Sequence, residues 1–268
     1  MRGRADFHFR LDKVLTMREL TNKPTVTIDG VNLPILNTGK DGKIYNCYVE
    51  PLQRFKREID AMLSHHSKVF MLRFDVRVDT HSQTNEQMTR FLRSYIPRVE
   101  RYYKTKNVAY VWCREVEKSK KQHYHFAVMV DGSNATRVSQ ELLRMADEVA
   151  AFQKLRIGYC ENASYFIKRT DLAKGDYSTY NDAFERLSYL AKERGKTIKA
   201  ERANSYQTSR IKPRLNERGE VFSHKDDYME YIKHKAASKQ VTAVPKRTAT
   251  EKPIHMMTDA ERQLPLFA

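Results

Sequence analysis

The feature that most constrains the fold is the alternation in KVFMLRFDVRVD, residues 68–79, where one face is apolar from Phe70 to Val78 and the other carries Met71, Arg73, Asp75 and Arg77. Successive side chains of a β-strand point to opposite faces, so this pattern predicts a half-buried strand with one apolar and one charged face. The charged face carries Arg73, Asp75 and Arg77. Such a strand has to lie in a sheet whose apolar face is covered by other elements.

Helical and strand-like patterns follow one another in a regular order along the chain. Apolar residues at helical spacing predict helices, and short alternating or apolar runs predict strands. In chain order, the predicted elements are a helix at 51–66, the strand at 68–79, a helix at 84–103, strands at 107–117 and 123–130, a helix at 134–152, a strand at 154–160 and a helix at 181–195. The central β-α-β-β-α-β order predicts an α+β fold of the ferredoxin or RRM-like type, in which two helices cover one face of an antiparallel sheet.

Changes in composition and in the periodicity of apolar residues divide the 268 residues into three segments. Residues 1–47 contain short β-like runs broken by proline and glycine, and we expect an N-terminal extension there. Residues 48–212 hold the predicted elements and form the expected functional domain. From residue 213 to residue 268 the chain is basic and has little periodicity apart from one short helical stretch, which indicates a largely flexible tail.

The charge of the chain favours a polyanionic partner. The 49 basic residues exceed the 33 acidic ones, which gives a formal net charge of +16. Such an excess attracts nucleic acid and makes binding depend on salt through counterion release. No apolar stretch approaches the roughly 20 residues of a membrane-spanning helix, and the first residues lack the apolar segment of a signal peptide. We therefore expect a cytoplasmic protein with no membrane partner.

Two histidines lie at the start of the strand HYHFAVMV, directly after the lysine-rich stretch KSKKQ. If KSKKQ is the whole loop of a hairpin, Glu117 lies opposite His123 and Glu115 lies opposite His125. These four side chains then share one face of the sheet, whereas Tyr124 turns toward the core. The histidines are therefore expected on an open face, with a carboxylate across from them.

This group is a candidate metal site. Two imidazoles and a carboxylate can hold a divalent ion while leaving positions for water or a phosphate oxygen. We expect His123, His125 and Glu115 to be the ligands, with Glu117 as the alternative carboxylate if the register differs. A His-x-His pair alone is more often structural, so the prediction depends on the carboxylate, the open face and the basic charge of the chain.

A candidate nucleophile lies in the predicted helix at 181–195. Phe184 and Leu187 belong to its apolar stripe, and at about 100° per residue Tyr189 points almost directly away from that stripe. Lys192 lies about one turn further along, on the side of Tyr189. A lysine at that distance can stabilise a phenolate or a phosphorane-like transition state. Tyr189 is therefore a candidate nucleophile with Lys192 as its helper, and the alternative is an ordinary surface tyrosine.

The order of these motifs resembles that of the HUH endonucleases, which are named for a His-hydrophobic-His strand and carry a helical Tyr-x-x-Lys. MLRFDVRV, WCRE, HYH, RLSYLAK and QTSR, within residues 48–212, are similar to a replication initiator family of inoviruses and prophages. The resemblance implies a Mg²⁺ or Mn²⁺ ion held by His123, His125 and Glu115. It also implies that Tyr189, helped by Lys192, nicks single-stranded DNA at a replication origin and forms a 5′-phosphotyrosine. Such an enzyme initiates rolling-circle replication of a phage or prophage-like element in the nucleoid of a bacterial host.

Three alternatives stay open. Tyr165 and Lys168 in SYFIK also fit Tyr-x-x-Lys, so Tyr165 is an alternative nucleophile. A transposase or relaxase would use the same chemistry in another DNA context. A non-catalytic RRM-like binder would stack bases on aromatic residues of the exposed sheet face, whereas the face assigned above carries Glu, His and Arg.

Several basic residues are candidates for contacts with DNA. They are Arg73, Arg77, Lys120, Lys121 and Arg210. For Arg73 and Arg77 a solvated surface position is the alternative, and Asp75 could orient a ligand histidine.

The stretch QLPLF near the C-terminus resembles the short bacterial motif that docks in the sliding clamp of the replicative polymerase. A polar Gln263 followed by Leu264, Leu266 and Phe267 on a tether suits a hydrophobic groove. We therefore expect this part of the tail to bind the clamp.

Overall fold

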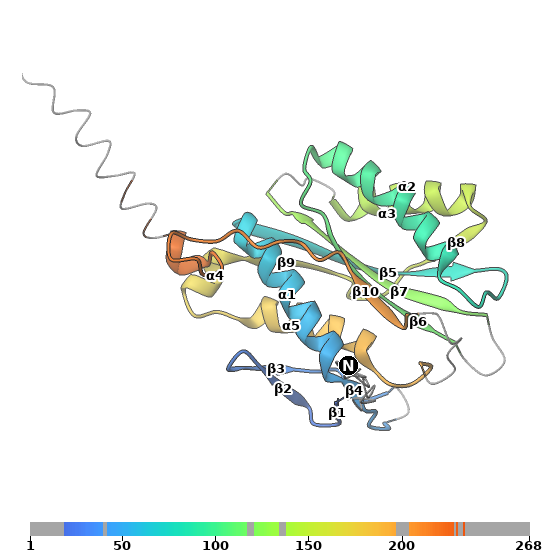
Figure 1. The fold of residues 1–268 in the computed structure, drawn as a ribbon, viewed down its shortest axis with the longest axis horizontal. Coiled ribbons are helices and arrows are strands. Elements are labelled where there is room, and N and C mark those ends of the chain that lie inside the picture. The colour runs from blue at the N-terminus through green and yellow to red at the C-terminus, as the bar shows by residue number, and fades with distance from the viewer. Residues whose placement is uncertain are drawn as a thin grey trace, which may run out of the picture. The chain divides into compact units, whose positions relative to one another are not determined.

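The structure is a computed structural model that describes residues 19–39, 42–116, 121–133, 138–196 and 204–227, together with Met229 and Lys233. Its elements form a mixed α+β unit around a six-stranded antiparallel sheet flanked by helices (Figure 1). Across the sheet the strands are β10 (Tyr206–Thr208), β6 (Ala109–Glu115), β7 (His123–Asp131), β5 (Lys68–Val78) and β8 (Leu155–Gly158), and β9 (Ser164–Lys168) also pairs with β5. The compact unit ends at Asp227. Within the described ranges no helix combines the length and the apolar character needed to cross a bilayer.

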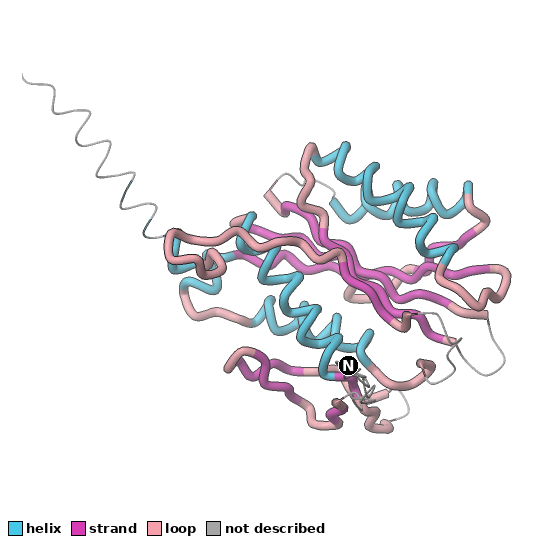
Figure 2. Tube along the Cα trace, in the orientation of Figure 1, coloured by secondary structure: helices cyan, strands magenta, loops and turns pink. Residues whose placement is uncertain are grey.

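One face of the sheet is covered by α2 (Glu86–Tyr103) and α3 (Val138–Phe152), as Figure 2 shows. The apolar side chains of β5 that alternate along the strand, from Phe70 to Val78, are buried on this face. Trp112, Tyr124 and Phe126 from β6 and β7 belong to the same core. The alternation in residues 68–79 thus predicted the buried face of β5 correctly.

The other face is covered too, by α1 (Val49–His65) and α5 (Ser178–Ser188), so the prediction of an open face is wrong. Cys113, Ala127 and Met129 on this face are fully buried in a second core. The reason is that the inner parts of β6 and β7 are apolar on both faces, and a strand with two apolar faces needs a covering layer on each. Polar residues of β6 and β7 lie on this second face only toward the strand ends: Glu115, His123 and His125 at one end, and Asp131 at the other.

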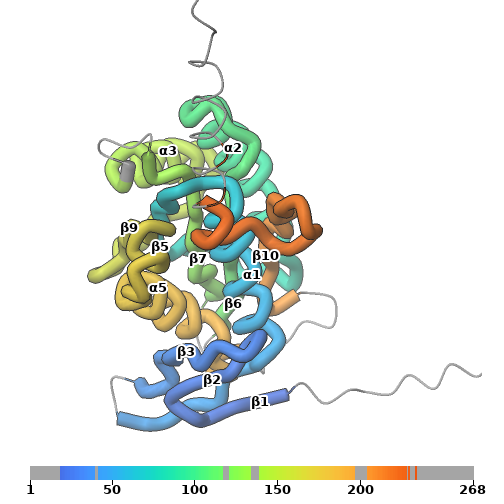
Figure 3. The backbone as a smooth tube through the Cα atoms, turned by 90° about the vertical axis from the view of Figure 1, so that its left-hand side faces the viewer, coloured from blue at the N-terminus to red at the C-terminus, as the bar shows by residue number. Residues whose placement is uncertain are grey.

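The N-terminal part of the unit packs onto this second layer. β1 (Leu20–Thr21) pairs with β4 (Cys47–Tyr48), and β2 (Thr25–Ile28) forms a hairpin with β3 (Val31–Pro34) beside α5 (Figure 3). Its turn is the pair Asp29 and Gly30, both at positive φ, which is the conformation that a two-residue hairpin requires. Buried side chains of this region, Val26, Ile28, Leu33 and Ile35, join the core formed by α1 and α5.

The helix expected at 181–195 is shorter in the structure. α5 ends at Ser188, and Tyr189–Ala191 form a single 3₁₀ turn, η1. Beyond it the chain is extended: Lys192 pairs with Cys47 in a β-bridge, and the backbone N–H of Glu193 donates to the carbonyl of Asn46. These bonds to the N-terminal segment replace the helical ones, which apolar spacing alone could not reveal. The sequence patterns also missed β9, β10 and the short helix α4 (Arg169–Ala173).

Candidate metal centre and tyrosine site

The hairpin of β6 and β7 differs in register from the sequence prediction. Glu115 pairs with His123, and Cys113 pairs with His125, because the connection runs from residue 116 to residue 122 rather than through KSKKQ alone. The register differs by two residues, and since side chains alternate with a period of two, every side chain keeps its predicted face. Glu117 lies outside the described residues, so its role as an alternative ligand stays a prediction.

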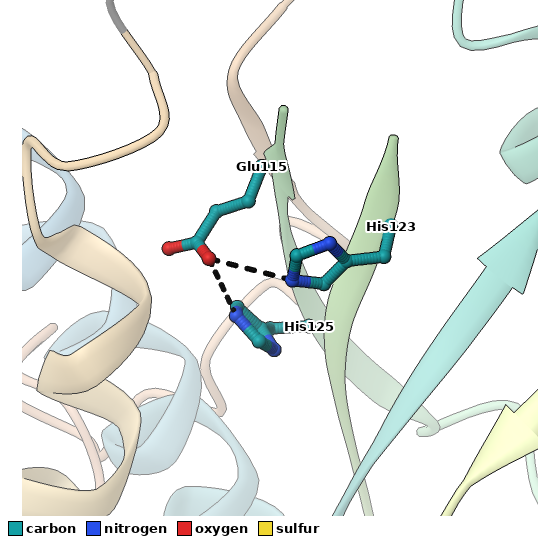
Figure 4. Close-up of side chains that lie close together, drawn as sticks. All are labelled: Glu115, His123 and His125. Atoms are coloured by element: carbon teal, nitrogen blue, oxygen red, sulfur yellow. Dashed lines mark hydrogen bonds and ion pairs between the residues drawn. The ribbon is translucent and has the colours of Figure 1, made fainter. Parts of the chain in front are cut away.

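Glu115, His123 and His125 converge on one point of this face (Figure 4). Oε2 of Glu115 lies 3.0 Å from Nε2 of His125 and 3.4 Å from Nε2 of His123. One ligand atom from each residue lies within 4.8 Å of the others, and His125 is only 5% exposed. Two nitrogens and a carboxylate oxygen at this separation could hold a metal ion.

His125 has a second carboxylate behind it. Nδ1 of its ring lies 2.7 Å from Oδ1 of Asp75 on the neighbouring strand β5. An ionised Asp75 keeps the proton on Nδ1, which leaves the lone pair of Nε2 directed at Glu115 and His123, as in metal sites with a carboxylate behind a ligand histidine. Arg73 lies 2.8 Å from the same Nδ1 and 3.2 Å from Asp75. Since a protonated Nδ1 cannot accept a hydrogen bond, we assign the Arg73 guanidinium as the ion-pair partner of Asp75.

Lys196 holds the other oxygen of Glu115, and the sequence patterns did not single it out. Its side chain is 1% exposed, and Nζ lies 3.5 Å from Oε1 of Glu115 and donates to the carbonyl of Lys192. Gly195, at φ 74°, turns the chain so that its carbonyl accepts from the N–H of Val116, next to Glu115. The available signal was Gly195 in KERGK, because a glycine there favours a turn that brings the following lysine back toward the sheet.

The pKa values of the centre follow from these contacts. Burial alone would raise the pKa of Glu115, but hydrogen bonds with His123 and His125 and the charge of Lys196 outweigh it and hold that pKa well below its usual range. Burial alone would lower the pKa of His125, but the hydrogen bonds to Asp75 and Glu115 outweigh it and raise that pKa. In the metal-free protein, therefore, Glu115 is ionised and His125 holds its second proton to higher pH than an exposed histidine does.

Replacing Lys196 should weaken metal binding without touching a ligand. Lys196→Met removes the charge that fixes Oε1 of Glu115, and loss of such a supporting contact typically costs about 10- to 100-fold in metal affinity. We expect this loss in Mn²⁺ affinity measured by isothermal titration calorimetry. Lys174→Met, at an exposed lysine after α4, is the matched control and should bind Mn²⁺ as the parent does. Equal affinities of both variants, with melting curves that show both folded, would contradict the assignment.

Metal affinity should rise with pH. A divalent ion needs Nε2 of His125 without its proton, and because the pKa of this imidazole is raised, the proton competes with the metal over a higher pH range than at an ordinary histidine. We expect the Mn²⁺ dissociation constant to fall between about pH 6 and about pH 8. Calorimetry in buffers of different ionisation heats should also show proton release on binding. A pH-independent affinity without proton release would contradict this description.

Tyr189 lies beside this centre. Its ring centroid is 5.3 Å from that of His125, and the Arg73 guanidinium lies 5.5 Å from the same ring. Nζ of Lys192 lies 4.4 Å from the ring centroid and donates to the carbonyl of Thr38. The sequence predicts that Tyr189 points away from the apolar stripe of its helix, but in the structure its half-buried ring packs against the core under α1 and α5. The structure nevertheless brings it to the predicted metal ligands.

The surroundings of Tyr189 act on its ionisation in opposite directions. Burial raises the pKa of the phenol, the charge of Glu115 adds to the rise, and the Arg73 guanidinium opposes it. Burial is also the main cause that lowers the pKa of Lys192. In the metal-free protein the phenol is therefore protonated at neutral pH, and positive charge close to it would favour its ionisation.

Tyr165 does not join this group. It lies on β9, where it pairs with Met71, and its hydroxyl donates to the carbonyl of Asn162. Lys168, the other half of this Tyr-x-x-Lys, is exposed and lies 3.9 Å from Asp171. None of these described contacts connects the pair to Glu115, His123 or His125, so the geometry favours Tyr189 over Tyr165.

The candidate DNA contacts fall into different environments. The strand phase placed Arg73 on an exposed face, which is wrong, because this residue is 6% exposed and its NH1 also donates to Sγ of Cys160. Arg77 is exposed, pairs with His123 across β5 and β7, and lies over Gly158. Lys121 and Arg210 are exposed as well. Lys120 and the clamp-motif residues Gln263, Leu264, Leu266 and Phe267 lie outside the described residues.

Comparison with known proteins identifies the family of the chain. A family model described as the YagK/YfjJ C-terminal domain matches residues 35–206, and this range contains the three candidate ligands, Tyr189 and Lys196. No curated protein and no solved structure matched the chain. Because the matched range covers more than half of its residues, the chain belongs to the YagK/YfjJ C-terminal domain family.

Proposed function

We propose that this protein is a metal-dependent enzyme of the HUH type that nicks and rejoins single-stranded DNA through a 5′-phosphotyrosine at Tyr189. The observation that carries the proposal is the position of Tyr189, whose ring lies 5.3 Å from that of His125 in the Glu115, His123 and His125 group. A tyrosine beside two histidines and a carboxylate that could hold a metal ion is an arrangement suited to this chemistry, because the ion would stabilise charge that develops on the phosphate.

The strand order supports the fold assumed in this proposal. The strands β6, β7, β5 and β8 are neighbours in that order, and α2 and α3, which follow β5 and β7 in the chain, cover the same face. This is the arrangement of a ferredoxin-like β-α-β-β-α-β unit. β9, β10, α1 and α5 would then be additions that build the second face and its site.

The residues would divide the chemistry as follows. Glu115, His123 and His125 would hold Mn²⁺ or Mg²⁺, and Asp75 and Lys196 would orient two of these ligands. A divalent ion bound there would offset the charge of Glu115 and draw electron density from a phosphate oxygen. Oη of Tyr189 attacks phosphorus, the Oη–P bond forms, the P–O3′ bond breaks, and in the net reaction the phenolic proton passes to the released 3′-hydroxyl. Attack by a 3′-hydroxyl on the phosphotyrosine reverses these changes and rejoins the strand.

The nearest biological role is initiation of rolling-circle replication of a phage or prophage-like element in a bacterial cell, for which the released 3′-hydroxyl is the primer. A transposase or a relaxase would use the same residues. A non-catalytic RRM-like binder is less favoured, because such a protein stacks bases on an open sheet face and both faces of this sheet are covered by helices.

The test is incubation of the purified protein with a pool of single-stranded oligonucleotides from the DNA around its own gene, in Mn²⁺ or in EDTA. We expect a protein-DNA adduct that survives denaturing electrophoresis in Mn²⁺ and is absent in EDTA. Sequencing of the attached DNA would give the cleavage site. Cleavage that leaves no attached DNA would refute the tyrosine mechanism, and binding without cleavage would favour the RRM-like alternative.

The tail motif should act separately from the nicking site. If QLPLF docks in the bacterial sliding clamp, deletion of residues 263–268 removes the Leu and Phe anchors and should abolish clamp binding in a pull-down assay. Adduct formation should be unchanged. Asp259→Ala, upstream of the motif, is the control and should retain clamp binding. Undiminished clamp binding after the deletion would rule out this role of the motif.

A further inference from the structure

A large groove lies along α1, apart from the metal centre. Its volume is about 880 Å³, and it is formed by α1, by residues around α4 and the start of α5, and by the segment from Thr208 to His224. We call it the α1 groove and define it by Arg57, Tyr177, Arg210, Lys212 and Phe222. Neither Tyr189 nor any of the three candidate metal ligands lines it.

The floor of the α1 groove is mainly apolar and partly aromatic. Leu172, Tyr180 and Phe222 are largely buried and line it, while Tyr177 is 41% exposed at its edge. Val221, also in the lining, is 45% exposed. An apolar and aromatic surface of this kind can contact the faces of nucleobases.

The acidic side chains of the groove have partners within the protein. Asp29 and Asp60 both pair with Lys56, at 3.3 Å and 2.7 Å. Oε2 of Glu58 accepts from the hydroxyl of Ser209 at 2.5 Å, and Oε1 accepts from the backbone N–H of Arg210 at 2.6 Å. The negative charges of these carboxylates are therefore directed at partners within the protein and oppose the basic residues at the rim only weakly.

Basic side chains surround the opening. Arg57, Arg210 and Lys212 are exposed, and the side chains of Arg57 and Lys212 have no hydrogen-bond or ion-pair partner in the described part of the chain. Arg210 adopts φ 61°, a left-handed conformation that arginine rarely takes, and the Glu58 hydrogen bond holds it there. The groove thus combines an apolar floor with a rim of positive charge, and a single-stranded nucleic acid matches both, because its phosphates are negative and its bases have apolar faces.

The position of α1 relates this groove to the tyrosine. α1 begins at Val49, directly after β4, whose Cys47 pairs with Lys192 in a β-bridge. The groove begins about one turn later, with Arg54, and continues toward the C-terminal half of the helix. A strand that lies along α1 would therefore lead away from the turn that carries Tyr189.

We infer that the α1 groove binds single-stranded DNA, with phosphates on Arg57, Arg210 and Lys212 and bases against the apolar floor. The inference rests on the proposed function and adds a binding site for the strand away from the scissile phosphate. In such a site each lost phosphate contact reduces the salt dependence of binding, since fewer counterions are released.

The test compares two double variants by fluorescence anisotropy with a labelled oligothymidylate in EDTA, where no cleavage occurs. One variant carries Arg57→Gln and Arg210→Gln. The matched control carries Arg90→Gln and Arg93→Gln, which removes the same charge from exposed positions of α2 on the opposite side of the sheet. For the groove variant we expect affinity to fall at least about 10-fold and the slope of log K against log salt to decrease by about 1.4. The control should keep the affinity and slope of the parent.

Equal losses in the two variants, or a parent that does not bind the oligonucleotide, would overturn the inference. A groove variant that binds DNA normally but changes from dimer to monomer in light scattering would assign the groove to contact between copies of the chain. Failure of the nicking proposal is distinguishable, because the parent would then form no covalent adduct in Mn²⁺ while the groove variant still lost affinity in EDTA. The opposite outcome, with an adduct and no groove effect, would refute the groove alone.

Discussion

Tyr189→Phe is expected to abolish covalent attachment of DNA, lowering the rate of adduct formation by at least about 10³-fold. Phenylalanine keeps the ring that packs beside His125, Arg73 and Lys192 but lacks the oxygen that would attack phosphorus in the proposed reaction. Metal binding and DNA binding should be unchanged, because neither uses the hydroxyl in this account. The rate is measured by denaturing electrophoresis of the adduct at saturating DNA and Mn²⁺.

Tyr165→Phe is the matched control. It removes a hydroxyl that donates to the carbonyl of Asn162 at the protein surface, so adduct formation should stay close to that of the parent. If Tyr189→Phe forms the adduct normally and Tyr165→Phe does not, the alternative Tyr-x-x-Lys of SYFIK contains the nucleophile. If both variants form it normally, neither tyrosine is the nucleophile.

His125→Ala should remove metal binding almost completely. This histidine is the most buried of the three candidate ligands, and a second carboxylate, that of Asp75, lies behind it. Loss of a supporting residue costs about 10- to 100-fold in affinity, so loss of a ligand should exceed about 100-fold. We expect no measurable Mn²⁺ binding by calorimetry in the micromolar range, and no DNA adduct in Mn²⁺.

His81→Ala is the control for this variant, because His81 is exposed and lies outside the centre. It should bind Mn²⁺ with the affinity of the parent. Circular dichroism is needed beside both measurements, since removal of His125 leaves Asp75 and Glu115 without a shared partner. A folded His125→Ala protein that binds Mn²⁺ as tightly as the parent would contradict the assignment of the metal centre.

Local patterns predicted much of the sheet and of its site. Alternation along residues 68–79 gave the buried face of β5, and the predicted hairpin placed Glu115 and both histidines on one face. That face assignment was correct although the register was not, because an error of two residues leaves every side chain on its side. An error of one residue in the register would have placed the Glu115 carboxylate on the opposite face of the sheet, in the core under α2 and α3.

Long-range contacts explain what the sequence patterns missed. Lys196 reaches Glu115 only because the chain leaves α5 at Ser188 and pairs with the N-terminal segment near Cys47. Arg73 was expected to face solvent because it lies on the strand face that carries polar residues. In the structure α5 and η1 cover this face, and Arg73 is buried beside Asp75. The covering layer has no periodic signal in the sequence, and Gly195 indicates a turn without showing that the turn packs against Glu115, so both contacts required the three-dimensional structure.

The turn from Tyr189 to Lys196 connects the two halves of the site. One end carries the candidate nucleophile beside His125, and the other end carries the lysine that pairs with Glu115. Both ends are held by backbone bonds, from Glu193 to Asn46 and from Val116 to Gly195. Because one short segment positions both groups, breaking either of these backbone bonds should affect metal binding and the orientation of Tyr189 together.

The most direct test of the account is identification of the residue that carries DNA. The adduct formed in Mn²⁺ would be digested with nuclease and protease, and the remaining nucleotide located by tandem mass spectrometry. We predict a 5′-phosphate linked to Tyr189. A nucleotide on Tyr165 or on any other residue, or DNA cut without remaining attached to the protein, would contradict it.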